Sequence, residues 1–167
     1  MYYTTDYKSP LGNITLASDG ECLIGVWLEG QKYFGGTVDL KMVQNDNLKV
    51  FQDTKIWFDK YFKNQRPEIS QLPLAPIGNS FRQTVWKILC DIPYGEVTTY
   101  GEIAKKIAVG GAVGHNPISI IIPCHRVVGS NGSLTGYAGG ISTKIKLLKH
   151  ENVDMTKLFI PKKSTSP

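Results

Sequence analysis

The chain contains little cysteine and little histidine. Its 167 residues include three cysteines, at positions 22, 90 and 124, and three histidines. An odd number of cysteines without C-x-x-C spacing argues against a disulfide framework and against a cysteine-rich zinc site. Free thiols are typical of a reducing compartment, so we expect a cytoplasmic protein.

Long apolar runs are absent as well. None approaches the roughly 20 residues that a membrane-spanning helix needs, so no membrane partner is expected. The opening residues, Met1 to Asp6, have neither the basic region nor the apolar core of a secretory signal. Apolar residues still make up 41% of the chain, which predicts one large or two small packed domains rather than disorder.

The positive charge is distributed unevenly. Residues 1–80 carry 8 Lys/Arg and 9 Asp/Glu, a net charge of −1, whereas residues 81–167 carry 11 and 5, a net charge of +6. A basic half favours a polyanionic partner, because neutralising phosphates supplies most non-specific affinity for DNA. Charge alone leaves a merely soluble basic surface equally possible.

The first part of the chain predicts a sheet covered by a helix. Three short apolar or β-branched runs at residues 2–7, 12–18 and 22–28 are separated by turn-forming residues. Residues 47–64 then carry apolar side chains at three- and four-residue spacing, which predicts a helix. We interpret its aromatic residues as core rather than as a platform for stacking bases. We expect an N-terminal domain at 1–64 and a proline-rich linker at 65–78.

The second part predicts a mostly helical domain over residues 79–160 and a loose tail at 161–167. Ser80 with Gln83, and Thr99 with Glu102, match the capping-box pattern that marks the start of a helix. A further helix follows toward residue 150. The fold class expected from both parts is α+β, with a small antiparallel sheet and a helix in the N-terminal domain and a mostly helical C-terminal domain.

The most informative stretch is Ile120-Ile121-Ile122-Pro123-Cys124-His125-Arg126-Val127-Val128. Its apolar flanks predict two short buried strands that hold a rigid turn. A thiol beside an imidazole can become a reactive thiolate, since a nearby base or positive charge lowers the pKa of cysteine. Alternatively, Cys124 is a small core residue, because free cysteine is among the most buried residue types.

Four motifs together decide between these readings: Gly114-His115-Asn116-Pro117, Ile122-Pro123-Cys124-His125-Arg126-Val127-Val128, Gly136-Tyr137-Ala138-Gly139-Gly140 and Leu147-Leu148-Lys149-His150-Glu151. In this order and spacing the chain resembles the O6-alkylguanine-DNA alkyltransferases, most strongly over residues 79–152. The resemblance implies direct DNA repair by irreversible, stoichiometric transfer of an alkyl group from O6-alkylguanine, and less readily from O4-alkylthymine, to Cys124. It implies no cofactor. The zinc site of some family members is not expected, because Cys22 is the lone candidate ligand in the first half.

The resemblance also assigns the catalytic residues. Cys124 is the alkyl acceptor, and His125 is the general base that acts on it through a bridging water. Glu151 orients the imidazole and favours its charged form, as in a Cys-His-acid triad. Asn116 supports the turn before the cysteine, and Arg126 is expected to pair with a carboxylate beneath the site.

The implied partner is double-stranded DNA, bound in its minor groove by a monomer, with the damaged nucleotide flipped out of the stack. Tyr100 corresponds to a tyrosine that donates to the base near N3. The predicted substrate-binding residues are Tyr100, Val113, Val127, Tyr137, Ala138 and Gly139. The predicted DNA-binding residues, on the second helix of a helix-turn-helix, are Ala108, Gly110, Gly111, Ala112 and Gly114.

The chain departs from the family pattern before this second helix. Ile107 stands where an Arg or Gln commonly fills the space of the flipped base, and the turn between the two helices is missing. Either residues are absent between Ile107 and Ala108, or the turn is truly deleted. A true deletion supports an alternative function, a lesion-sensing DNA-binding protein with weakened transfer on duplex DNA. A cysteine hydrolase is disfavoured because such enzymes bring their histidine from a distant part of the sequence.

Overall fold

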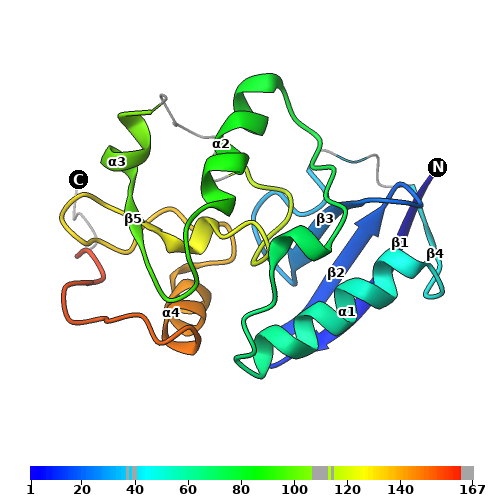
Figure 1. Cartoon of the computed structure of the whole chain (residues 1–167), viewed down its shortest axis with the longest axis horizontal. Helices are drawn as coiled ribbons and strands as arrows, with labels where there is room; N and C mark the ends of the chain where they lie inside the picture. Colours follow the sequence, from blue (N-terminus) through cyan, green and yellow to red (C-terminus); the bar gives the residue numbers. More distant parts are fainter. Residues whose placement is uncertain (37, 39–40, 107–112, 114, 163–167) are drawn as a thin grey trace.

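The structure is a computed structural model, and it describes residues 1–36, 38, 41–106, 113 and 115–162. A small sheet with one long helix is followed by a mostly helical second part (Figure 1). This arrangement confirms the expected α+β class. No helix in the described ranges is long and apolar enough to cross a membrane.

The N-terminal sheet contains four strands in the order β3-β2-β1-β4. They are β1 Tyr2–Ser9, β2 Gly12–Ser18, β3 Leu23–Leu28 and β4 Met42–Gln44. The first three are antiparallel neighbours, as the turn-separated runs predict, but β4 pairs parallel to β1. The sheet is therefore mixed rather than antiparallel. Three residues are too short for a periodic signal, so β4 was not predictable.

Helix α1, Lys49–Phe62, packs across the sheet. Phe51, Trp57, Phe58 and Tyr61 are all buried, and the Phe58 ring stacks on Tyr7 of β1 with centroids 5.3 Å apart. These aromatics belong to the core, as expected, and are not a surface for bases.

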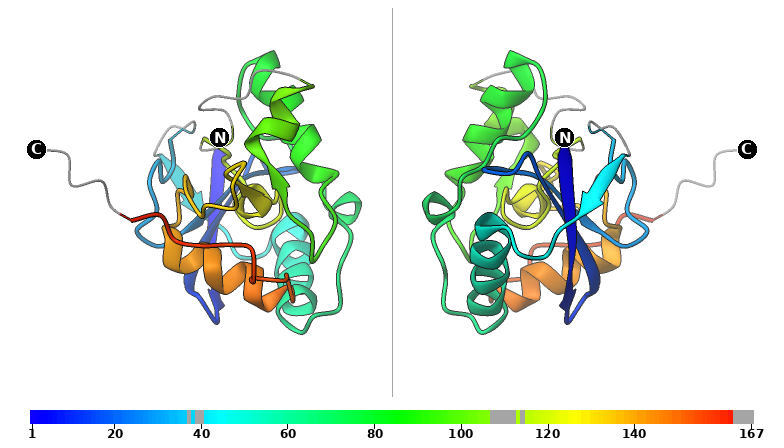
Figure 2. Two further views of the ribbon diagram at one scale, coloured as in Figure 1. Left: turned by 90° about the vertical axis from the view of Figure 1, so that its left-hand side faces the viewer. Right: turned by 90° about the vertical axis from the view of Figure 1, so that its right-hand side faces the viewer.

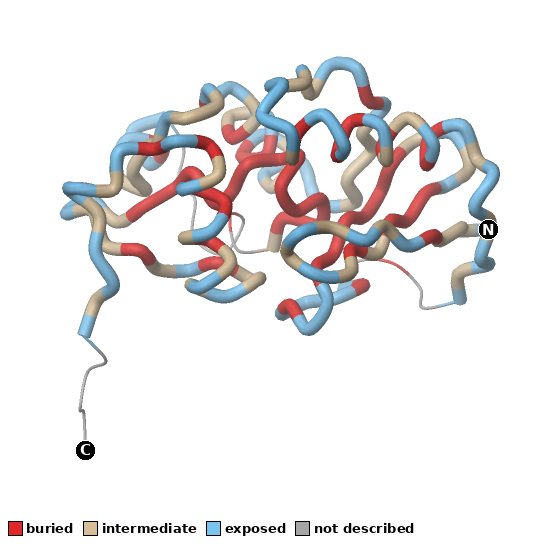
Figure 3. Tube along the Cα trace, turned by 90° about the horizontal axis from the view of Figure 1, so that it is seen from below, coloured by how far each residue is buried: buried red, intermediate tan, exposed pale blue. Residues whose placement is uncertain are grey.

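Strand β3 is buried along its whole length, and two later segments pair with its outer edge. Figure 3 shows that the buried residues gather in the interior of the molecule and the exposed ones at its periphery. Leu23 exchanges backbone hydrogen bonds with residues 73 and 75 of the linker. Farther along, the Val26 N–H donates to Pro117 O at 2.9 Å, and the Ser119 N–H donates to Val26 O at 3.0 Å. The sheet edge therefore fixes the chain just before Cys124.

The described residues of the second part form α-helices, short 3-10 helices and a two-stranded pair, β5 with β6 (Figures 1 and 2). After the 3-10 turn Ile69–Gln71, the elements are α2 Ser80–Cys90, β5 Thr98–Thr99, α3 Tyr100–Ala104, the 3-10 helix η3 Cys124–Arg126, β6 Val127–Val128 and α4 Ile141–His150. The C-terminal ends of α1 and α4 lie close together, since Asn64 Nδ2 donates to His150 O at 2.7 Å.

Two local expectations need correction. The N-cap of α2 is Asn79 and not Ser80, because the Asn79 side chain accepts from the Arg82 N–H at 2.8 Å. The isoleucine run before Cys124 forms turns and not a strand, with Ile120 at a φ of 71°. An apolar run indicates burial, but it does not distinguish a strand from a buried loop.

Candidate active site

Cys124 begins the short helix η3 and is only 7% exposed. The Asn116 side chain holds the turn that precedes it. Asn116 Nδ2 lies 2.8 Å from Ile122 O and 3.3 Å from Cys124 Sγ, while its Oδ1 accepts from the Ile118 N–H at 3.0 Å. The amide thus fixes both the loop backbone and the sulfur.

His125 is fully buried and pairs with Glu151, with Nε2 and Oε2 2.5 Å apart. Burial lowers the pKa of His125 below its ordinary value, although the hydrogen bond and charge of Glu151 act to raise it. Glu151 favours the charged form of the ring, as expected, but burial outweighs it, so the ring is neutral at rest. Because Nε2–H donates to the carboxylate, Nδ1 carries the lone pair. No described residue bonds Nδ1, so it is free to accept a proton.

Glu151 itself has three close partners. Besides His125, it accepts from Arg126 Nε on Oε1 and from the Tyr61 hydroxyl on Oε2, both at 2.6 Å. Burial alone would raise the pKa of Glu151, but the hydrogen bonds and charges of His125 and Arg126 hold it well below its ordinary range. The carboxylate is ionised, and the predicted pairing of Arg126 with a carboxylate is present.

The Cys124 sulfur is a protonated thiol at rest. Burial raises its pKa above the ordinary value, although the Asn116 hydrogen bond and the Lys144 charge act in the opposite direction. A reactive thiolate at Cys124 therefore requires that the thiol first gives up its proton to a base.

Lys144 is a functional candidate that the sequence analysis missed. Its side chain is fully buried in α4, and Nζ donates to Val127 O at 2.5 Å and to Thr135 O at 2.8 Å. Burial lowers the pKa of Lys144 to about 8. A lysine on the same helix face as Leu147 and Leu148 was an available signal, since such a residue is seldom buried without partners.

Not all of the predicted substrate-binding residues are accessible to a substrate. Tyr137 is buried and its hydroxyl has no partner among the described residues. The Tyr100 hydroxyl lies against Gly136, where an added Cβ would be 2.8 Å away. Val113 and Val127 are core residues, 1% and 0% exposed. Tyr100, Tyr137 and the neighbouring glycines therefore remain the better candidates for direct contact.

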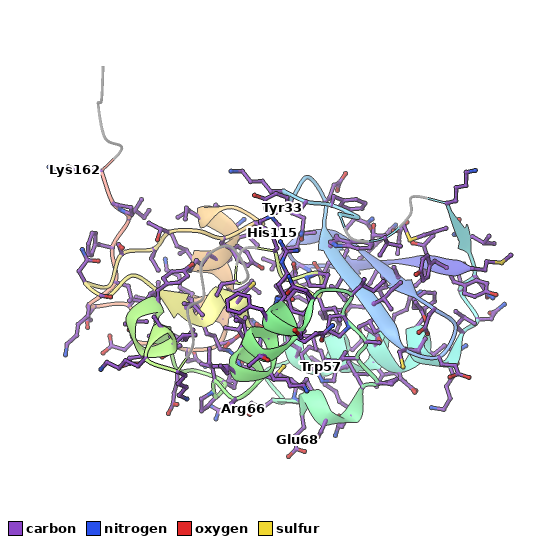
Figure 4. The ribbon with its side chains drawn as sticks, turned by 90° about the horizontal axis from the view of Figure 1, so that it is seen from above. Tyr33, Trp57, Arg66, Glu68, His115 and Lys162 are labelled. Carbon is purple, nitrogen blue, oxygen red and sulfur yellow. The ribbon has the colours of Figure 1, made fainter. Side chains whose placement is uncertain are left out.

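A loop of the N-terminal domain joins this region. The Lys32 N–H donates to Ala138 O at 3.0 Å, and the Tyr33 ring stacks on His115 with centroids 4.1 Å apart (Figure 4). A cavity of about 580 Å³ lies between Lys32 and Tyr33 on one side and residues 136–141 on the other. The spacing of residues in the chain did not predict this contribution.

The predicted DNA-binding residues Ala108, Gly110, Gly111, Ala112 and Gly114 lie outside the described residues, as does Ile107. A second cavity, of about 720 Å³, opens between the two parts of the chain and is lined by Trp57, Arg66, Glu68 and Arg126 among others (Figure 4). It does not include Cys124, so the chemistry is not placed there.

Comparison with known proteins identifies both parts of the chain. Residues 1–76 match the family described as 6-O-methylguanine DNA methyltransferase, ribonuclease-like domain, and residues 80–153 match the DNA binding domain of the same name. The methylated-DNA–protein-cysteine methyltransferase of Haemophilus influenzae is 43% identical over 160 residues, covering 92% of this chain and 87% of that protein.

Solved structures agree. The crystal structure of Mycobacterium tuberculosis O6-methylguanine methyltransferase has a TM-score of 0.80 at 40% identity, covering 91% of this chain and 93% of that one. Mycobacterium tuberculosis OGT in complex with DNA has a TM-score of 0.77 at 40% identity, covering 90% and 92%. The chain belongs to the methylated-DNA–protein-cysteine methyltransferase family.

Proposed function

We propose that this protein repairs DNA by taking the alkyl group of O6-alkylguanine, and less readily that of O4-alkylthymine, onto Cys124. The observation that carries the proposal is a buried thiol bonded by Asn116 and followed directly by a neutral histidine whose far nitrogen is anchored on Glu151. A thiolate is a strong enough nucleophile to attack an alkyl ether carbon.

In the proposed reaction, the thiol proton passes to Nδ1 of His125, directly or through a water. The new S–C bond forms as the bond between the alkyl carbon and O6 breaks, and the electron pair stays with the guanine. Tyr100 donates to the base near N3 and stabilises the charge that develops there. The imidazolium is stabilised by the ionised Glu151.

The product is a thioether, which water does not readily cleave. Among the described residues, no group could restore the thiol, so each molecule is proposed to act once and repair to be stoichiometric. The target atom is hidden inside a duplex, so the nucleotide is flipped into the protein. Residues 108, 110–112 and 114 are proposed to press against the minor groove, and the protein is proposed to act as a monomer in a reducing, cytoplasmic compartment.

The test is incubation with O6-benzylguanine labelled on its benzyl group. We expect one label per protein molecule in the wild type and in the matched control Cys90→Ser, and none in Cys124→Ser. Repeated release of product would instead indicate a hydrolase. A folded wild type that takes no label from the free base or from duplex DNA would favour the lesion-sensing alternative and overturn the proposal.

A further inference from the structure

Helix α1 of the N-terminal domain reaches the catalytic carboxylate. The Tyr61 hydroxyl donates to Glu151 Oε2 at 2.6 Å, across 90 positions of sequence. This is the same oxygen that His125 Nε2 contacts at 2.5 Å. Tyr61 is 1% exposed and Glu151 is 0% exposed, so water does not compete for the bond.

The surrounding contacts hold the tyrosine firmly in this position. Its ring stacks on Trp57 with centroids 5.5 Å apart and an interplanar angle of 8°. His150, next to Glu151 in the chain, has its Nε2 2.8 Å from the Tyr61 carbonyl oxygen. Since a carbonyl oxygen can only accept, His150 Nε2 carries the hydrogen. The end of α1 therefore binds both the backbone and the side chain at the end of α4.

We infer that Tyr61 is a positioning residue for alkyl transfer, which keeps His125 neutral by withdrawing negative charge from the carboxylate oxygen that the imidazole contacts. This rests on the proposed function of Cys124. A hydrogen bond to the charged form of a carboxylate reduces its basicity. A less basic Glu151 stabilises the imidazolium less, so Nδ1 stays unprotonated and available to the thiol.

Every charged or titratable group around the pair enters this balance. Arg126 from η3 bonds the other carboxylate oxygen. The positive charges of Arg126 and of Lys144 from α4 both lower the pKa of His125. Cys124 and Tyr137 face the histidine side, and Tyr94 packs edge-on against Tyr61. Burial keeps the pKa of Tyr61 well above its ordinary value, so the phenol remains a donor throughout the range in which the thiol reacts.

The test compares Tyr61→Phe, which retains the ring stacking, with Tyr7→Phe. Tyr7 also makes a tyrosine–carboxylate hydrogen bond, donating to Asp59 of α1 at 2.7 Å. Among the described residues, neither Tyr7 nor Asp59 bonds Glu151 or His125. The rate of transfer from O6-benzylguanine is measured from pH 5.5 to 9. We expect Tyr61→Phe to be about tenfold slower than wild type near pH 6 and within about twofold near pH 9, because its histidine takes up a proton at higher pH. Tyr7→Phe should follow the wild type at every pH.

A merely structural role for Tyr61 predicts a different outcome, an equal loss of rate at all pH values, and that result would overturn the inference. Titration of the His125 ring by NMR gives a second reading that does not depend on transfer. Its midpoint should rise in Tyr61→Phe and stay unchanged in Tyr7→Phe, and an unchanged midpoint in both overturns the inference. An unlabelled wild type would count against the proposed function instead, so the two failures are distinguishable.

Discussion

Cys124 and His125 form a neutral pair, and this changes how their reactivity is explained. A buried thiolate without full compensation is costly, and burial accordingly raises the pKa of Cys124 and lowers that of His125. The sulfur therefore carries no charge at rest. In the proposed reaction, the charges that develop would be stabilised by His125, the ionised Glu151 and the buried Lys144.

The first prediction concerns Glu151→Gln. The pKa of Glu151 is lowered in the folded state, so the carboxylate contributes stability that is fully present above its unfolded pKa and is lost as the pH falls toward the folded one. The variant also leaves the buried Arg126 without the negative charge that Glu151 places beside it. We expect its free energy of unfolding at pH 7 to be about 3 kcal/mol lower than that of the wild type.

Denaturant unfolding at several pH values checks this prediction. The difference in the free energy of unfolding between Glu151→Gln and the wild type should narrow below about pH 4. In that range Glu151 takes up a proton in the unfolded wild type but not in the folded protein. Glu21→Gln, at an exposed position, should match the wild type. A gap of constant size down to pH 2 would contradict the assigned ionisation.

At the scale of single residues, the family motifs predicted which side chains lie near Cys124. Asn116, His125 and Glu151 are brought together as expected, although their catalytic roles stay predictions. Tyr61 was interpreted only as core, because a contact across 90 positions depends on how the two domains meet. Lys144 was not predicted, because a lysine beside apolar residues on a helix ordinarily extends its ammonium group into solvent.

The elements around the site show what apolar patterning does and does not specify. The spacing of apolar residues predicts α1 to within two residues at each end. The run before Cys124 has no such period, and its backbone follows the edge of β3 and the Asn116 amide instead. Tertiary contacts decided the conformation of that segment, so its sequence alone could not.

The second prediction concerns the start of α2. Asn79→Ala should lower the free energy of unfolding by about 1 kcal/mol, because it removes the acceptor of the Arg82 N–H. Ser80→Ala, one residue on, should have almost no effect. Thermal or denaturant unfolding of both variants decides which residue is the cap, and a larger loss for Ser80→Ala would restore the capping-box interpretation.

The third prediction concerns Gly136, which has a φ of 73° and leaves no room for a Cβ beside the Tyr100 hydroxyl. Gly136→Ala should displace the phenol, slow transfer at least tenfold, and cost about 1–3 kcal/mol in stability. The control is Gly12→Ala, at a φ of 105° with open space around it. It carries backbone strain without a clash.

Transfer rates and unfolding free energies of both glycine variants are compared. Gly12→Ala should lose stability but transfer at the wild-type rate once folded. Equal transfer rates in the two variants would show that the Tyr100 hydroxyl does not act on the substrate.

At the scale of the whole molecule, the two parts of the chain meet at the proposed catalytic site. Cys124, His125 and Glu151 come from the second part, and the first part contributes Tyr61 and the edge of β3. The domain boundaries at residues 64 and 79 remain predictions from composition. The sequence indicated two units and their charge difference, but not that Tyr61 of the acidic half bonds Glu151 of the basic half.

The fourth prediction follows from that charge difference. Lys105 and Lys106 are exposed at the end of α3, directly before the predicted DNA-binding residues. Replacing both with alanine should weaken binding to duplex DNA and reduce the slope of log affinity against log salt by about 2. The pair Lys60 and Lys63, exposed on and after α1, serves as the matched control. Equal losses in the two double variants would mean that the basic half does not direct the contact.

The most direct test of the central claim is the mass of the protein after exposure to a duplex oligonucleotide with one O6-methylguanine. We predict that each molecule gains a single methyl group, that peptide mapping places it on Cys124, and that the guanine is restored without release of the base. A folded protein in which Cys124 stays unmodified, or in which the methyl group lies on Cys22 or Cys90, would contradict this account.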